Sequence, residues 1–260
     1  MRLWLSGPGL CLIVAVVLAL TACSGGALPY YGEGKVVATY PHDPAAFTQG
    51  LDFDGETLYE STGLYGESTI RRVDLETGEV LEIEHLPAEF FGEGCTVWKD
   101  ALIQLTWKAG TGFVYDKETF QKLDRFEYPG EGWGLTTDGR RLIMSDGTST
   151  LRFLDPKTFQ ELDRVEVLDE GEAVDRLNEL EWIRGQVWAN VWQTPSIVRI
   201  DPKSGEVLGW IDFSALAEKE TGGVLNGIAV RGRNVYVTGK RWSSLYRIEV
   251  QPAQTTPSAP

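Results

Sequence analysis

Polar side chains recur at one position of a repeated sequence pattern, and they are the groups best able to do chemistry in this chain. A polar or aromatic residue stands among glycines and apolar residues in each of five copies, at Gln49, Glu93, Gly132 or Trp133, Asn178 and Asn226. Glu93 is flanked by Gly92 and Gly94. An apolar setting desolvates a carboxylate and raises its pKa toward the range useful for proton transfer. Glu93 is therefore the candidate general acid/base, whereas Asn226 is equally well explained as a cap for backbone groups.

Tryptophans and a lysine stand at the ends of the strands expected to return to the same place. Trp107 and Trp192 end two of these strands and Lys240 ends another. With Trp133 they are expected to converge near Glu93. Aromatic walls with a few aimed polar groups are the usual composition of a small-ligand site. Cys95, just after Glu93, is expected to face the protein interior and not to take part in catalysis.

The elements that must position these residues come from a fivefold repeat. A strand ending in Asp, followed by a polar turn that closes on Thr or Ser, occurs at Asp74, Asp116, Asp155 and Asp201, with a degenerate fifth copy ending at Glu249. Periods of about 40–50 residues with short strands predict four-stranded blades. We therefore predict an all-β fold, a five-bladed β-propeller of four-stranded antiparallel blades over residues 35–251. An N-terminal strand near residues 35–40 is expected to close the ring and remove its free edges.

The N-terminal segment has the pattern of an export signal. Arg2 precedes an apolar run over residues 10–20, and the sequence Leu20-Thr21-Ala22-Cys23 follows and resembles a bacterial lipobox. We predict a lipoprotein signal peptide over 1–22, lipid attachment at Cys23, a tether over 23–34 and a disordered tail over 252–260. The protein would then be exported and lipid-anchored on the periplasmic or cell-surface side of a bacterial membrane. The alternative is an ordinary signal peptide in which Cys23 is incidental.

Composition excludes several classes of protein. The formal net charge is -14, which argues against a nucleic-acid-binding surface because such surfaces need clustered cations. A hydrophobic content of 42% excludes wholesale disorder and a polytopic membrane protein. With 2 histidines and 3 cysteines, a dedicated zinc site is hard to assemble. Cleavage before Cys23 and its acylation would leave Cys95 as the one free thiol, so packing alone must hold the fold.

Eight motifs in order resemble the plant-type glutamine cyclotransferases, a family that also occurs in bacteria. The motifs occupy residues 47–51, 63–68, 91–94, 104–107, 130–135, 177–181, 189–192 and 225–229. The resemblance implies a five-bladed propeller that converts the N-terminal glutamine of peptides or proteins to pyroglutamate and releases ammonia. Such an enzyme is an acyltransferase of the aminoacyltransferase class.

The resemblance also implies roles for individual residues. It implies that Glu93 is the catalytic acid/base, with a site around the substrate formed by Phe47, Gln49, Trp107, Trp133, Asn178, Trp192 and Lys240. The chemistry of the reaction adds catalytic roles for Asn178 and Lys240, which are expected to stabilise the oxyanion that develops on the amide oxygen. Indole N–H groups are expected to help stabilise the oxyanion, and Glu131 and Glu179 are expected to point elsewhere. No cofactor is required for the chemistry. A metal on the propeller axis is known in the family, which allows a structural Ca²⁺ here, but its ligands are not located by the sequence.

Two other functions compete with this interpretation. One is a non-catalytic lipoprotein propeller that binds peptides or assembly partners at its mouth. The other is a calcium-dependent lactonase-like propeller, which would need several carboxylates on the axis. A scaffold has no need of a glycine-flanked glutamate in an aromatic pocket, and the five ring positions contain a single carboxylate.

Overall fold

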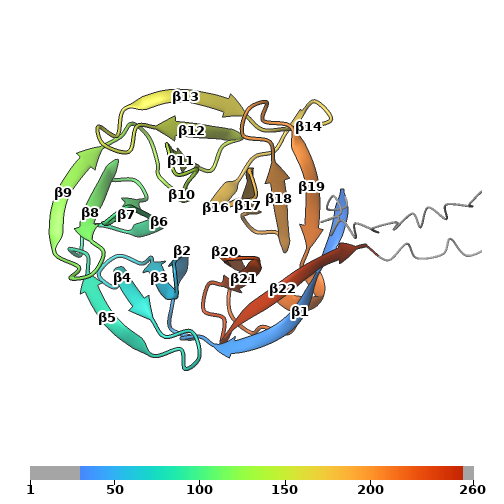
Figure 1. The fold of residues 1–260 in the computed structure, drawn as a ribbon, viewed down its shortest axis with the longest axis horizontal. Coiled ribbons are helices and arrows are strands. Elements are labelled where there is room, and N and C mark those ends of the chain that lie inside the picture. The colour runs from blue at the N-terminus through green and yellow to red at the C-terminus, as the bar shows by residue number, and fades with distance from the viewer. Residues whose placement is uncertain (1–29, 254–260) are drawn as a thin grey trace, which may run out of the picture.

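The computed structural model describes residues 30–253, which form twenty-two strands and one short helix arranged around a central axis (Figure 1). The predicted all-β class is confirmed. The predicted signal peptide, Cys23 and most of the tether and tail lie outside the described residues. The first strand, β1 (Tyr31–Pro41), begins inside the predicted tether. No helix within residues 30–253 is long and apolar enough to cross a membrane.

Three sheets have four antiparallel strands each, with consecutive strands adjacent. The first contains β2 (Thr48–Asp54), β3 (Thr57–Thr62), β4 (Thr69–Val73) and β5 (Val80–His85). The second contains β6 (Gly92–Trp98), β7 (Ala101–Thr106), β8 (Thr111–Asp116) and β9 (Lys122–Glu127). The third contains β10 (Leu135–Thr137), β11 (Leu142–Met144), β12 (Thr150–Leu154) and β13 (Glu161–Glu166).

The remaining long strands belong to one eight-stranded sheet with the order β16-β17-β18-β19-β1-β22-β21-β20. Its members besides β1 are β16 (Leu177–Ile183), β17 (Gln186–Val191), β18 (Ser196–Ile200), β19 (Val207–Asp212), β20 (Leu225–Arg231), β21 (Asn234–Gly239) and β22 (Ser244–Pro252). A two-stranded sheet, β14 (Leu168–Asp169) and β15 (Glu172–Ala173), precedes it. The helix α1 (Ser214–Ala217) follows β19.

The prediction of a five-bladed β-propeller with separate four-stranded blades is wrong, because the structure has an eight-stranded sheet where two blades were expected. β1 causes the difference. It pairs with β22 in antiparallel register and also with β19 in parallel register, from Tyr31 opposite Trp210 to Glu33 opposite Asp212. The repeat spacing marks each group of strands but contains no information about a strand that bridges the last two groups.

The repeated Asp motif forms the turn between the third and fourth strands of a repeat. The Asp74 carboxylate accepts hydrogen bonds from the backbone N–H and the hydroxyl of Thr77, both at 2.8 Å. Gly78 then has a φ of 71°, the left-handed conformation that glycine adopts without steric cost. Phe120 occupies the equivalent position after Asp116 with a φ of 57°. The predicted polar turn that closes on Thr is confirmed, and its left-handed position is occupied by Gly in some copies and by Phe in others.

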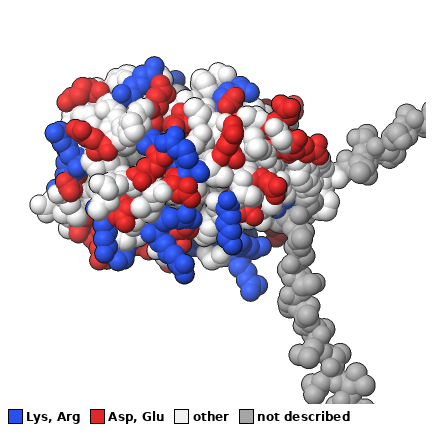
Figure 2. Space-filling model, turned by 90° about the horizontal axis from the view of Figure 1, so that it is seen from above, with Lys and Arg blue, Asp and Glu red and all other residues white. Residues whose placement is uncertain are grey.

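The hydrophobic core lies between neighbouring sheets. In one cluster, for example, Leu105 of the second sheet packs with Leu135 and Met144 of the third. The outer strands are largely exposed and carry many of the charges, as in the sequence of β9. On the face seen in Figure 2, Lys and Arg side chains lie among Asp and Glu side chains. Charges of both signs in mixture are typical of a solvated protein surface.

Candidate functional site

The innermost strand of several repeats begins with a β-bulge, and the recurring polar residues lie in these bulges. The strand register shifts between Thr48 and Gly50, between Gly92 and Cys95, and equivalently at the starts of β16 and β20. The residues inside these bulges include Gln49, Glu93, Asn178 and Asn226. Bulges leave a residue unpaired and redirect its side chain, and they are frequent beside active sites.

The third sheet departs from this pattern, and Trp133 occupies its position in the ring. β10 begins only at Leu135, so the segment 130–134 is irregular. Trp133 is anchored by a 3.0 Å bond from its N–H to the Ser145 carbonyl, and its own carbonyl accepts the N–H of Gly94 at 2.6 Å. A Cβ on Gly94 would lie 2.5 Å from the nitrogen of Leu135. Glycine at 94 therefore allows the backbone beside Glu93 to touch the backbone beside Trp133.

A pocket of about 260 Å³ lies at this mouth of the axis. Its lining consists of Phe47, Gln49, Phe91, Glu93, Trp107, Trp133, Asn178, Trp192 and Lys240. The structure thus brings together all eight residues of the pocket that the sequence predicted, and adds Phe91. Its size is slightly below the usual range of about 300–1,000 Å³ for ligand pockets, so it suits a single side chain better than a large ligand.

Glu93 is the buried acid of this pocket. Its residue is 4% exposed, and its Oε2 atom has no hydrogen-bond partner within the described residues. Burial raises the pKa of the Glu93 carboxyl well above its usual range, Lys240 opposes that rise, and the charge of Glu131 adds to it. A carboxyl with a raised pKa is a stronger base when it ionises and is suited to moving protons near neutral pH.

Lys240 supplies the cation. Its backbone is fixed at the end of β21, where its N–H donates to the Val224 carbonyl at 2.9 Å and its own carbonyl accepts the Gly223 N–H at 2.7 Å. The ammonium lies 4.9 Å from the centroid of the Phe47 ring. Burial lowers the pKa of Lys240 to about 8, although Glu93 acts in the opposite direction.

Two amide side chains complete the polar part of the pocket. Gln49 accepts a hydrogen bond of 3.2 Å on its Oε1 from Asn226, whose Nδ2 also donates to the Thr48 carbonyl at 2.9 Å. Asn226 is fully buried and is absent from the pocket lining, so of its two interpretations the structure favours the cap. The Oδ1 of Asn178 is buried without a partner in the described part of the chain. Asn178 and Glu93 are thus two lining residues with unsatisfied polar atoms, which is typical of a site that awaits a ligand.

Aromatic rings form the walls through edge-to-face contacts. Phe91 packs against Phe47 with centroids 6.0 Å apart and against Trp107 at 5.6 Å. Trp133 packs against Trp192 with centroids 5.5 Å apart and an interplanar angle of 89°. Such pairs add about 0.5–1.5 kcal/mol beyond area burial, and they restrain the rings. The two sets of rings give the pocket rigid apolar sides.

Glu131, which was expected to point elsewhere, is absent from the pocket lining but binds two of the tryptophans that line it. Its Oε2 accepts the indole N–H of Trp107 at 2.7 Å and that of Trp133 at 2.9 Å. These two indole N–H groups are therefore engaged and are not available to an oxyanion, so the expected role for them is wrong. Glu179, the other acid expected to point elsewhere, is buried and absent from the pocket lining.

Comparison with known proteins assigns this arrangement to a family. Residues 10–250 match the glutamine cyclotransferase family. The chain belongs to that family. It is 48% identical over 231 residues to a glutaminyl-peptide cyclotransferase of Arabidopsis thaliana, covering 85% of this chain and 72% of the relative. It is also similar to the crystal structure of the Myxococcus xanthus glutaminyl cyclase, with a TM-score of 0.81 and 35% identity over 86% of this chain and 98% of the other.

Sequence reasoning missed two residues at this cyclotransferase site: Phe91, which lines the pocket, and Glu131, which binds two indoles of its walls. Phe91 stands in the same motif as Glu93, and Glu131 stands in the same motif as Trp133. Membership of those motifs was the available signal. The directions of the two side chains depend on contacts with Trp107 from another part of the chain, which the motifs do not reveal.

The buried acids on the axis do not offer a set of ligands for the metal that the family resemblance implied. The Glu179 carboxyl accepts the N–H groups of Leu51 and Ile228, at 3.2 and 2.8 Å. The Glu181 carboxyl accepts the N–H of Val230 at 2.9 Å. Burial raises the pKa of both carboxyls well above the usual value. Within residues 30–253 no group of three or more His, Cys, Asp or Glu side chains is arranged to hold a metal ion.

Cys95 lies in the core, as expected. It is 1% exposed and packs in a cluster with Tyr59, Ile70 and Phe113. Burial raises the pKa of its thiol well above the usual value, which disfavours the reactive thiolate.

Proposed function

We propose that this chain is a glutaminyl-peptide cyclotransferase, which converts the N-terminal glutamine of peptides or proteins to pyroglutamate with release of ammonia. One observation carries the assignment of roles: a buried glutamate with an unpartnered oxygen faces a small aromatic pocket that also contains a buried lysine. The family and the named relatives support the same activity.

The pocket favours the reaction by folding the substrate. The α-amine of the glutamine attacks its own γ-carboxamide carbon, so the nucleophile is already tethered. Trp107, Trp133, Trp192 and Phe47 enclose the side chain, and Gln49 binds the first peptide group. Holding the reacting atoms in contact can supply about 7–11 kcal/mol when the orientation is ideal.

Glu93 moves the protons. Its carboxylate takes a proton from the attacking amine as the new C–N bond forms, and the carboxamide carbon becomes tetrahedral. The same group then protonates the departing nitrogen, the C–N bond to that nitrogen breaks, and ammonia leaves. Atoms and charge balance without a cofactor or a covalent enzyme intermediate. One general acid/base of this kind contributes about 10²–10⁴-fold.

Asn178 and Lys240 stabilise the charge that develops on the amide oxygen. The Lys240 ammonium is a preorganised cation in a site from which water is largely excluded, where electrostatic stabilisation is strongest. The amide N–H₂ of Asn178 is the second donor. This pair replaces the indole N–H groups, two of which bind Glu131.

The activity is tested by incubating the purified protein with a Gln-initiated peptide and measuring by mass spectrometry whether the product has lost one ammonia. An N-acetylated copy of the peptide has no nucleophilic amine and should not react. Glu93→Gln should bind the peptide and fail to turn it over. Binding of both peptides without any loss of ammonia would identify a non-catalytic peptide-binding protein instead.

We also propose that the protein is exported and lipid-anchored through Cys23, on the strength of the Leu20-Thr21-Ala22-Cys23 motif. Cys23→Ala should release the protein from the membrane fraction, because acylation would be its anchor. A Cys23→Ala variant that stays in the membrane fraction through a salt wash would contradict the lipobox assignment.

A further inference from the structure

Glu131 joins two walls of the pocket that come from different sheets. Trp107 directly follows β7 of the second sheet, and Trp133 precedes β10 of the third. One carboxylate oxygen accepts both indole N–H groups, at 2.7 and 2.9 Å. The backbone adds a third link, since the N–H of Gly132 donates to the Trp107 carbonyl at 3.0 Å.

Hydrogen bonds to a charged acceptor are stronger and more directional than neutral ones. Each hydrogen bond fixes the N–H edge of an indole at Glu131, and both of these rings line the pocket. The effect extends to the third tryptophan, because Trp133 packs edge-to-face on Trp192. A single carboxylate thus determines the positions of the aromatic walls that would enclose the substrate.

We propose that Glu131 is a positioning residue for the cyclisation, holding Trp107 and Trp133 in the orientation that binds the glutamine side chain. This inference rests on the proposed function. It assigns Glu131 no contact with the reacting atoms. It differs from the roles implied by the family resemblance, in which Glu131 had none.

The charge of Glu131 also reaches Glu93. The ionisable groups around Glu93 are Lys240 directly after β21, Glu131 from the segment before β10 and the hydroxyl of Tyr128. Lys240 lowers the pKa of Glu93, and Glu131 raises it. Removing the charge of Glu131 should therefore lower that pKa, and the acid limb of kcat/KM should move to lower pH.

Two substitutions separate geometry from charge. Glu131→Gln keeps an acceptor oxygen at the same reach, so we expect KM to change by less than about threefold while the acid limb moves to lower pH. Glu131→Asp keeps the charge but withdraws the acceptor by one methylene, so we expect KM to rise about tenfold or more with the acid limb nearly unmoved. Tryptophan fluorescence should change more in Glu131→Asp than in Glu131→Gln.

The control is Glu76→Gln, an exposed acid in the turn between β4 and β5, which should leave KM, the pH profile and the fluorescence unchanged. Peptide binding to the inactive Glu93→Gln background, with and without Glu131→Asp, gives a readout that does not depend on turnover. If both Glu131 variants had the same KM, pH profile and peptide binding as the wild type, the positioning role would be overturned. An inactive wild type would instead refute the proposed function, and the binding measurement would still test Glu131.

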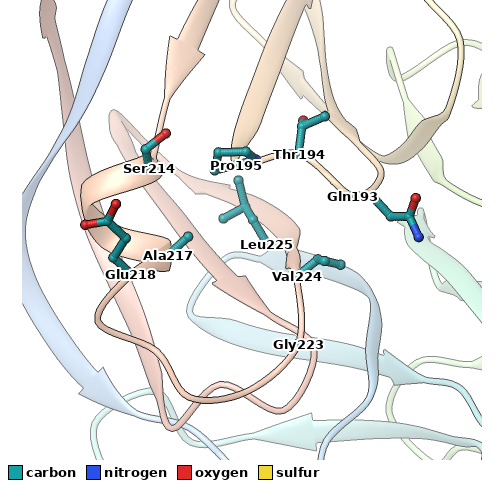
Figure 3. Close-up of a pocket in the computed structure, with 9 residues that line it drawn as sticks. All are labelled: Gln193, Thr194, Pro195, Ser214, Ala217, Glu218, Gly223, Val224 and Leu225. Atoms are coloured by element: carbon teal, nitrogen blue, oxygen red, sulfur yellow. The ribbon is translucent and has the colours of Figure 1, made fainter.

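A different observation concerns where the rest of the peptide lies. A groove of about 390 Å³ is bounded on one side by residues 193–195, between β17 and β18. Its other boundaries are α1 and the stretch that leads into β20, as Figure 3 shows. The exposed carboxylate of Glu218 stands at its edge.

Two of the segments that bound this groove are directly linked to residues of the pocket. Gln193 follows Trp192, which lines the pocket, and Gly223 and Val224 form the backbone hydrogen bonds that hold Lys240. Both the α-amine and the side chain of the glutamine must lie inside the pocket for cyclisation. The rest of the peptide therefore has to leave through the mouth of the pocket, and the groove is formed by the segments that follow Trp192 and hold Lys240.

We infer that this groove binds the second and third residues of the substrate and favours basic side chains there through Glu218. The inference rests on the proposed function and names a substrate preference for it. An exposed carboxylate attracts a nearby cation modestly, so the expected preference is a change of severalfold and falls with salt.

The test compares KM for Gln-initiated tripeptides that carry Lys or Glu at the second and third positions. We expect KM to be about three- to tenfold lower for the Lys peptides, and Glu218→Lys to reverse the order with kcat little changed. The control Glu76→Lys adds the same charge change in the β4–β5 turn and should keep the wild-type order. Equal KM values for both peptides, or an order that Glu218→Lys leaves intact, would overturn the groove assignment while turnover itself upheld the cyclotransferase.

Discussion

The ammonium of Lys240 lies 4.9 Å from the centroid of the Phe47 ring, within the pocket that also contains the Glu93 carboxyl. An aromatic face attracts a cation, and the attraction is larger where the cation is desolvated. Burial nevertheless lowers the pKa of Lys240 to about 8, with Glu93 acting in the opposite direction. The cation is thus charged at neutral pH and close to losing its proton in mildly alkaline solution.

If Lys240 stabilises the oxyanion in its charged form, kcat at saturating peptide should fall as the pH rises through about 8. Lys240→Arg keeps its charge to above pH 12, so this alkaline fall should disappear, whatever the variant's kcat at neutral pH. Lys240→Met should lower kcat by about 10²–10³-fold, the usual cost of losing one oxyanion donor. A kcat for Lys240→Met within about threefold of the wild type would remove Lys240 from the catalytic step.

Replacing Glu93 by Gln keeps its size and removes the proton carrier. We expect kcat to fall by about 10²–10⁴-fold with KM little changed, because the aromatic walls and Gln49 remain. The melting temperature should stay near that of the wild type, since no ion pair is broken. In the wild type, activity should rise with pH as Glu93 loses its proton, along a limb above the ordinary carboxylate pKa, because burial raises the pKa of this group.

The control for Glu93 has to be an acid outside the pocket. Glu131 is unsuitable because it binds two pocket indoles, and Glu179 because it is buried on the axis. Glu127, exposed on the outer strand β9, serves instead, and Glu127→Gln should keep full activity. If Glu93→Gln retained more than about a tenth of the wild-type kcat, the proton transfer would have to be assigned to another group.

Chelation of transition metals should leave turnover of a Gln-peptide nearly unchanged. Of the two histidines, His42 has both ring nitrogens engaged, with the Trp242 carbonyl at 2.7 Å and with Glu60 at 2.9 Å. His85 is exposed on β5. Neither lines the pocket. Loss of activity with a chelator, restored by zinc, would contradict this prediction, and melting curves with and without a calcium chelator test the structural Ca²⁺ that the sequence allowed.

The pocket was predictable because its residues stand in short motifs that repeat along the chain. Glu93 and Gln49 occupy bulges at the starts of inner strands, and all the repeats except the third place such a bulge at the same mouth. Trp107 and Lys240 each directly follow a strand that returns to this mouth. A regular repeat therefore converts positions in the sequence into positions around an axis.

What the sequence could not give depended on contacts between distant segments. The parallel pairing of Tyr31 with Trp210 joins two groups of strands into one sheet, and no local pattern indicates it. The direction of Glu131 is decided by an indole 24 residues away. The sequence repeat predicts which strands form. The β1–β19 pairing and the direction of the Glu131 side chain depend instead on which segments pack together in the fold.

A second buried cluster of charged residues, His42, Glu60 and Arg71, contacts the start of β2, the strand that carries Gln49 of the pocket. The Glu60 carboxylate accepts hydrogen bonds from Arg71 at 2.9 and 2.7 Å and from the Thr48 hydroxyl at 2.6 Å. Burial alone would raise the pKa of Glu60, but the charges of His42 and Arg71 lower it to about 2. Burial lowers the pKa of His42, and the charge and hydrogen bond of Glu60 outweigh this and raise it overall.

Glu60→Gln should lower the free energy of unfolding by about 3–5 kcal/mol, the cost of leaving a buried charge without its partner. The pH dependence should change with it. The Glu60 contribution is present above the unfolded carboxylate pKa of about 4.3 and is lost as the pH falls toward 2. The His42 contribution is present below about pH 6.5 and is lost as the pH rises through the raised folded value. Wild-type stability from this cluster should therefore be greatest between about pH 4.5 and 6.5, and Glu60→Gln should flatten that maximum in denaturant unfolding curves.

The control is Glu56→Gln, which breaks an ion pair with Arg231 in which Glu56 is 87% exposed. This substitution should lower the free energy of unfolding by less than about 1 kcal/mol. A Glu60→Gln protein as stable as this control, with an unchanged pH profile, would show that the cluster does not stabilise the fold.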